Sequence, residues 1–257
     1  MKEDYLDAGD GDHAIIEMSL IFALELAVLY VGGSYAMARL AGLLGFRRGG
    51  AGLGRVAFYL LVLPGVTLHE AAHYLACLLT GTRVMRFVPF WPQRSASGRL
   101  LLGYVRHERR PFPVRAVIGL APILLNPLGI LLVTALLTPL TGAEVTDPRF
   151  EVIKEGILTS GFLTGSPLVA TTWIYLSFSF ALGSVPSRED LSSVPAALLF
   201  FGGGVFLVSF LQEGSESTIT GALYDLSALA VRMYSLPAAV AVAAAVVIGF
   251  WGRRTLY

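Results

Sequence analysis

Charged residues are scarce in this sequence. Only 14% of its 257 residues are Asp, Glu, Lys or Arg, whereas 55% are hydrophobic, and the mean hydropathy is +0.68. Soluble domains carry about 25% charged residues, so the composition excludes an ordinary soluble domain and predicts an integral membrane protein. The net charge of +1 and the lack of an interleaved basic and aromatic pattern give no indication of nucleic-acid binding.

Cysteine is nearly absent as well, because Cys77 stands alone. A single cysteine excludes an internal disulfide and cannot form a metal site by itself. The amino-terminal stretch MKEDYLDAGDGDH is acidic where a signal peptide would be basic, so we expect the first hydrophobic span to be retained. No repeat or low-complexity linker divides the chain, which predicts a single membrane domain over residues 1–257.

Long apolar runs, in contrast, are abundant. A helix needs about 20 residues to cross a bilayer. The first run is longer than that, so we expect its ends to tilt or project, and Pro237 predicts a kink or a break in the last run. The expected fold is an all-α polytopic membrane protein with about six transmembrane helices, at residues 14–45, 54–80, 114–140, 162–185, 194–212 and 219–251.

Positive charge gathers in one connection, which covers residues 81–113 and the start of the next span. The positive-inside rule predicts that this connection is cytoplasmic. With six spans, both termini are then cytoplasmic too, in a multi-pass protein of the cell membrane. Against the single acid Glu108, the connection contains Arg83, Arg86, Arg94, Arg99, Arg106, Arg109, Arg110 and Arg115.

The same connection contains two β-prone runs. VMRFVPFW (84–91) and GRLLLGYVRH (98–107) are separated by the turn-like stretch PQRSAS (92–97). One interpretation is a small β hairpin after the second helix, lying against the membrane surface. Such a hairpin has an edge that can pair with an extended peptide. The other interpretation is an irregular loop, and the sequence does not decide between them.

Residues 67–81, TLHEAAHYLACLLTG, place three ionisable side chains inside the second expected span. A charge near the bilayer centre costs roughly 2.5–3.5 kcal/mol or more, so such residues call for a function. HEAAH is an instance of H-E-x-x-H. On a helix, His69 and His73 lie one turn apart on one face and can bind one Zn²⁺, while Glu70 can act as a general base toward water. The alternative is a buried polar cluster that neighbouring helices satisfy.

The motif helix LHEAAHYLACLLTG, followed by a β-prone cytoplasmic segment and further spans, resembles the site-2 protease family of intramembrane zinc metalloproteases, peptidase family M50. The resemblance covers about residues 55–190, with 14–45 and 194–251 as accessory spans. It implies a metalloendopeptidase with one Zn²⁺ per chain that hydrolyses a peptide bond in or near a transmembrane segment of a membrane-protein substrate, within the lipid bilayer.

Two other functions stay open. One is an M50-like membrane scaffold or chaperone without catalysis, although a binding protein has no need of the general base Glu70. The other is a metal transporter, although the spans lack the several intramembrane carboxylates that a translocation path usually shows.

The resemblance also implies two further site residues. Family members often have a Gly-Pro-x-x-Asn motif whose Asn points at the active site. The stretch GLAPILLNP has three residues instead of two between Pro122 and Asn126. Asn126 is therefore either a catalytic residue or a residue that caps or kinks its helix.

The family's third zinc ligand is an Asp, commonly within Asn-Pro-x-x-Asp-Gly, and this chain lacks that string. A catalytic zinc needs three protein ligands. Outside the polar amino terminus and the expected outer loop at residues 141–161, the aspartates are Asp190 and Asp225. The expected topology places Asp190 at the inner end of the fourth span, toward the same side as His69 and His73, and places Asp225 near the outer face. Asp190 is therefore the expected ligand; alternatively it caps or begins the fifth helix.

Overall fold

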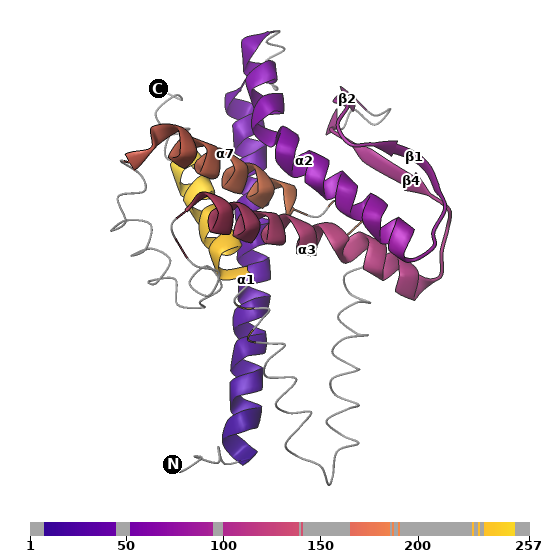
Figure 1. The fold of residues 1–257 in the computed structure, drawn as a ribbon, viewed down its shortest axis with the longest axis vertical. Helices are drawn as coiled ribbons and strands as arrows, with labels where there is room; N and C mark the ends of the chain where they lie inside the picture. The colour runs from indigo at the N-terminus through magenta and orange to yellow at the C-terminus, as the bar shows by residue number, and fades with distance from the viewer. Residues whose placement is uncertain are drawn as a thin grey trace.

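A computed structural model describes residues 8–44, 52–94, 100–138, 140, 165–185, 187, 190, 228, 231 and 234–249. These residues are mostly helical, and a small β segment follows the second helix (Figure 1). The expected helical class and the position of the β segment are thereby confirmed. The expected span 194–212 lies outside the described residues.

Three described helices are long and apolar enough to cross a membrane, so the chain has the character of a membrane protein. They are α1 (Ala8–Leu43, with the apolar part Leu20–Leu43), α2 (Leu53–Leu79) and α3 (Phe112–Leu137). Two further helices are apolar but shorter: α7 (Pro167–Gly183) and the helix Tyr234–Gly249. The described residues therefore contain three helices of spanning length instead of the six expected spans. The last helix runs through Pro237, so this proline does not end it.

Helices α2 and α7 approach each other closely at two glycines. A Cβ atom built on Gly65 would lie 1.8 Å from the backbone oxygen of Ser179, and one built on Gly183 would lie 2.4 Å from the oxygen of Gly65. The Gly65 amide donates to Ser179 Oγ at 2.9 Å. Small residues allow this approach between apolar helices. The contact brings the carboxyl end of α7 to the middle of α2, one turn before His69.

The connection between α2 and α3 is an antiparallel hairpin in two parts, which decides between the two interpretations of this segment. Trp91 N donates to Leu102 O between the parts. The stretch 92–97 is not wholly a turn, because the pairing continues into its first residues. The pairs are β1 (Val84–Val88) with β4 (Tyr104–His107), and β2 (Gln93–Arg94) with β3 (Leu100–Leu101).

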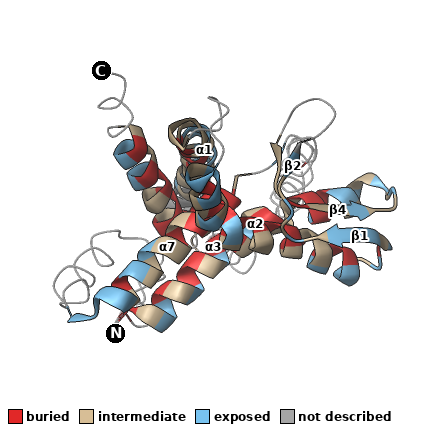
Figure 2. Ribbon diagram, turned by 90° about the horizontal axis from the view of Figure 1, so that it is seen from above, coloured by how far each residue is buried: buried red, intermediate tan, exposed pale blue. Residues whose placement is uncertain are grey.

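The hairpin lies beside the carboxyl-terminal half of α2 (Figure 1). The Phe87 ring stacks on the Tyr74 ring, with their centroids 4.7 Å apart. A Cβ atom built on Gly103 would lie 2.7 Å from Cγ of Glu70, so only a glycine fits there without a shift. Buried residues gather where α2, α3 and α7 meet, whereas β1 is largely exposed and β4 is mostly of intermediate burial (Figure 2). The fold thus surrounds the HEAAH turn with α3, α7 and the hairpin.

Candidate metal centre

The two histidines of α2 project toward one point. Their Nε2 atoms are 3.2 Å apart, and the rings meet edge to face with centroids separated by 4.8 Å. One helical turn between the residues produces this arrangement, as expected from their spacing. Both side chains are largely enclosed, with 11% of His69 and 12% of His73 exposed.

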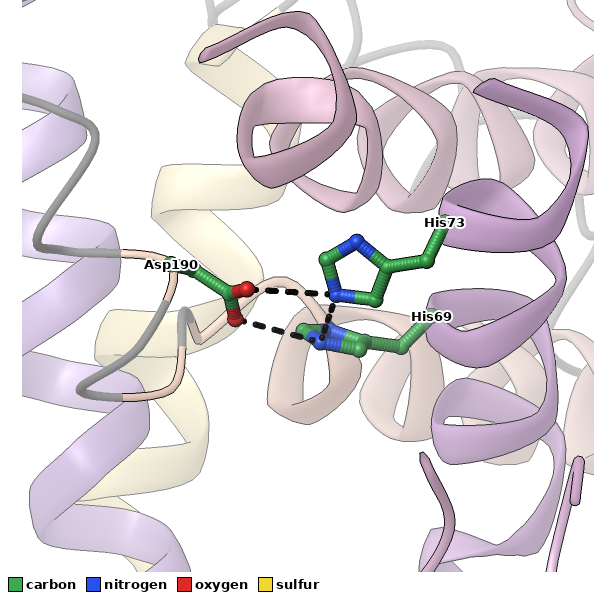
Figure 3. A group of neighbouring side chains, drawn as sticks. All are labelled: His69, His73 and Asp190. Atoms are coloured by element: carbon green, nitrogen blue, oxygen red, sulfur yellow. Dashed lines mark hydrogen bonds and ion pairs between the residues drawn. The ribbon is translucent and has the colours of Figure 1, made fainter. Parts of the chain in front are cut away.

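Asp190 arrives at the same point from the segment that follows α7 (Figure 3). Its Oδ2 lies 3.5 Å from Nε2 of His69, its Oδ1 lies 3.3 Å from Nε2 of His73, and its side chain is 8% exposed. The structure thus brings together the three residues expected as ligands. This buried His-His-Asp group can hold a metal ion. Asp225, the rival aspartate, lies outside the described residues.

The two imidazole nitrogens have about the spacing of neighbouring ligands around a small tetrahedral ion. Metal–ligand bonds of about 2.0–2.1 Å at tetrahedral angles place neighbouring ligand atoms about 3.3–3.4 Å apart. The two Nε2 atoms are 3.2 Å apart, and each lies 3.3–3.5 Å from a different oxygen of Asp190. With one ligand atom taken from each residue, all three atoms lie within 4.8 Å of one another. Two imidazoles with one carboxylate also form a donor set found in catalytic zinc sites, which leaves a fourth position open.

The other nitrogen of each imidazole is held by a backbone carbonyl. His69 Nδ1 donates to Gly183 O and His73 Nδ1 donates to Ile118 O, both at 2.8 Å. A carbonyl can only accept, so each Nδ1 carries a hydrogen, and a neutral imidazole then has a bare Nε2. Two bare nitrogens 3.2 Å apart repel each other unless a cation or a proton lies against them. Carbonyl partners of this kind are typical of histidines that bind metals.

Ser187 holds the Asp190 carboxylate in place. The Ser187 amide donates to Asp190 Oδ2 at 2.7 Å, and the Asp190 amide donates to Ser187 Oγ at 3.2 Å. This reciprocal pair has the form of a capping box, with an aspartate in the position usually held by Glu or Gln. The two roles considered for Asp190 are therefore compatible, because one carboxylate makes the local cap and faces the histidines. The S-x-x-D spacing in the sequence could have indicated this capping role of Ser187.

Glu70 follows His69 on α2 and is 9% exposed. It is not a member of the His-His-Asp group. Within the described part of the chain, its carboxylate has no hydrogen-bond partner, and Gly103 of the hairpin lies against its Cγ atom. The side chain is thus enclosed beside the group without being engaged by it.

Asn126 is fully buried in α3 and lies one contact away from the group. Its Nδ2 donates to Pro122 O at 3.3 Å, and its Oδ1 has no hydrogen-bond partner among the described residues. A Cβ atom built on Gly183 would lie 2.7 Å from that Oδ1. Asn126 therefore touches the residue whose carbonyl binds His69, while its hydrogen bond stays within its own helix.

No family model, curated protein or solved structure matches this chain.

Proposed function

We propose that this chain is an intramembrane zinc metalloprotease of the site-2 protease type, which hydrolyses a peptide bond in or near a transmembrane segment of another membrane protein. One observation carries the proposal: His69 and His73, on a helix apolar enough to cross a membrane, meet Asp190 in a buried group beside Glu70. Ionisable residues at such a place are costly and mark functional sites.

Each residue then has a role. His69, His73 and Asp190 would hold one Zn²⁺, which when bound would supply a Lewis acid for the scissile carbonyl and the attacking water. Glu70 accepts the proton of the attacking water and passes it to the leaving amine. Asn126 is a candidate for a hydrogen bond to the substrate, because its Oδ1 has no partner among the described residues.

The hairpin is suited to present the substrate. A helical substrate has all its backbone hydrogen bonds satisfied internally, so the scissile segment must be drawn out into an extended form before water attacks. An extended segment can pair with the edge of a strand. The hairpin supplies such strands next to the general base, since Gly103 between β3 and β4 lies against Glu70.

The test is proteolysis by the purified chain in proteoliposomes with a panel of single-span membrane proteins. We expect wild-type protein to cleave at least one of them, a chelator to stop cleavage and added Zn²⁺ to restore it. Binding of the panel without cleavage under any metal condition indicates the scaffold function instead. Uptake of Zn²⁺ into the vesicle lumen without cleavage indicates the transporter.

The orientation is part of the proposal: the arginine-rich connection and both termini face the cytoplasm. In a Cys77→Ala background, Ser97→Cys should resist a membrane-impermeant thiol reagent in intact cells and react after permeabilisation. The matched control is a cysteine in the acidic connection 141–161, which should react from outside. Labelling of position 97 in intact cells contradicts this orientation.

A further inference from the structure

Pro122 stands in the interior of α3, the 26-residue helix Phe112–Leu137. In a regular helix the amide of residue 122 would donate to the carbonyl of residue 118, four positions earlier. Proline has no amide hydrogen, and its ring crowds that same carbonyl. The Ile118 carbonyl therefore lacks its helical partner, and in an apolar layer no water replaces it.

The donor that reaches this carbonyl is Nδ1 of His73, at 2.8 Å. It comes from α2, which packs beside α3 (Figure 1). The bond joins a ligand of the candidate metal centre to the one carbonyl that Pro122 releases.

The same arrangement recurs at the two other prolines in the interior of α2 and α3. A carbonyl four residues before each proline accepts a side-chain hydrogen bond from a different helix. In these cases the donor is a tyrosine hydroxyl: Tyr175 donates to Leu60 O at 2.6 Å, ahead of Pro64, and Tyr234 donates to Ile123 O at 2.5 Å, ahead of Pro127. Each of these interior prolines thus leaves a backbone carbonyl that accepts a hydrogen bond from a neighbouring helix. At Pro122 the donor to that carbonyl is a histidine.

The carbonyl that accepts from His69 also lacks a partner within its helix, but for a different reason. Gly183 is the last residue of α7, and the last carbonyls of a helix have no intrahelical partner. Each histidine thus donates to a carbonyl that the helical hydrogen-bond pattern leaves open. Both imidazoles are consequently held with the hydrogen on Nδ1 and Nε2 directed at the other histidine and Asp190.

We infer that Pro122 is a positioning residue of the metal centre, because its missing amide hydrogen leaves the Ile118 carbonyl to fix the tautomer and orientation of His73. The inference rests on the metal centre of the proposed function, but not on proteolysis. It predicts that an amide hydrogen at position 122 weakens metal binding, because this hydrogen competes with His73 for the carbonyl.

Two replacements at position 122 isolate that hydrogen. Alanine restores it, whereas lactic acid, introduced by nonsense suppression, has the same methyl group but an ester oxygen instead of the N–H. In the purified full-length chain, with Zn²⁺ affinity measured by competition with a chelator, we expect Pro122→Ala to bind about tenfold more weakly. This is the lower end of the range for losing a hydrogen-bond partner of a metal-binding residue. The lactic acid variant should restore most of that affinity.

Pro127→Ala is the matched control, because it restores an amide in the same helix where the competing donor is Tyr234. Its Zn²⁺ affinity should stay close to that of the wild type. Equal losses in the alanine and lactic acid variants would assign the effect to the proline ring and overturn the inference, as would no loss in either.

A second measurement needs neither folding of a variant nor bound metal. In metal-free wild-type protein labelled with ¹⁵N-histidine, solid-state NMR should find the hydrogen of His73 on Nδ1. A bare Nδ1 overturns the inference even if the protein cleaves its substrates. Conversely, Nδ1–H in a protein without protease activity leaves the inference standing and removes the proposed function.

Discussion

Glu70→Gln should abolish proteolysis while Zn²⁺ stays bound. Glutamine keeps the size and the enclosed position of the side chain against Gly103, but its amide cannot take a proton from water. General acid–base groups contribute roughly 10²–10⁴-fold to rate, so turnover should fall by at least about two orders of magnitude. The three ligand atoms belong to other residues, which is why the metal content should not change.

Two readouts on the same preparation separate catalysis from metal binding. Cleavage of a membrane-anchored substrate in proteoliposomes gives the turnover, and elemental analysis gives Zn²⁺ per chain. Glu17→Gln is the matched control, since Glu17 lies exposed on α1, and both readouts should match the wild type. Unchanged cleavage in Glu70→Gln would refute the role of Glu70 as general base. Loss of Zn²⁺ together with turnover would make Glu70 a ligand or a structural residue.

The spanning helices were predictable because bilayer thickness sets a length that hydropathy reveals. The expected 54–80 became Leu53–Leu79, and 114–140 became Phe112–Leu137. The fourth run was expected at 162–185, but its described helix is only Pro167–Gly183. Hydropathy does not show where the backbone leaves the helical conformation. Here the chain leaves that conformation at the end of α7, and the segment that follows places Asp190 beside the histidines.

The hairpin was not decidable from sequence for a different reason. The stability of short strands depends on what they pack against more than on intrinsic preference. The stack of Phe87 on Tyr74 joins residues thirteen positions apart, and the fit of Gly103 against Glu70 joins residues still further apart. Neither contact has a local sequence signature.

The residues of the site likewise differ in whether a local sequence pattern could predict them. His69, Glu70 and His73 form a local pattern on one helix, so their spacing alone predicted their arrangement. Asp190 needed an argument from topology, because it is distant in sequence. The carbonyl partners at Gly183 and Ile118 could not be read directly, since every residue has a carbonyl. Pro122 was the available signal for the second, through the amide that it lacks.

The second large effect is expected at Asp190. Asp190→Asn should strip Zn²⁺ and remove proteolysis while expression and folding are preserved. The asparagine oxygen can still accept from the Ser187 amide, which keeps the cap. Its NH₂ group, however, cannot bind a cation, and the negative charge beside the two histidines is gone. Losing a direct ligand should cost more than the roughly 10–100-fold lost with a hydrogen-bond partner of a ligand, so we expect Zn²⁺ affinity to fall by more than about 100-fold.

Ser187→Ala tests whether the effect belongs to the ligand or to the cap. It removes the Oγ acceptor for the Asp190 amide but keeps the carboxylate and the backbone amide that donates to it. Zn²⁺ affinity should therefore fall by no more than about tenfold, as when a ligand loses one hydrogen-bond partner. A loss as large as that of Asp190→Asn would mean that the cap, and not the carboxylate, is what the site requires.

Asp225→Asn is the decisive comparison, because Asp225 is the other aspartate that the expected topology leaves near a span. If Asp190 is the third ligand, Asp225→Asn should retain Zn²⁺ and cleavage at wild-type levels. The geometry supports Asp190 as the ligand, because its oxygens lie 3.3 and 3.5 Å from the two Nε2 atoms and its side chain is buried. Metal loss in Asp225→Asn, with metal retained in Asp190→Asn, would refute the assignment. The segment that follows α7 would then have to hold Asp190 away from the histidines.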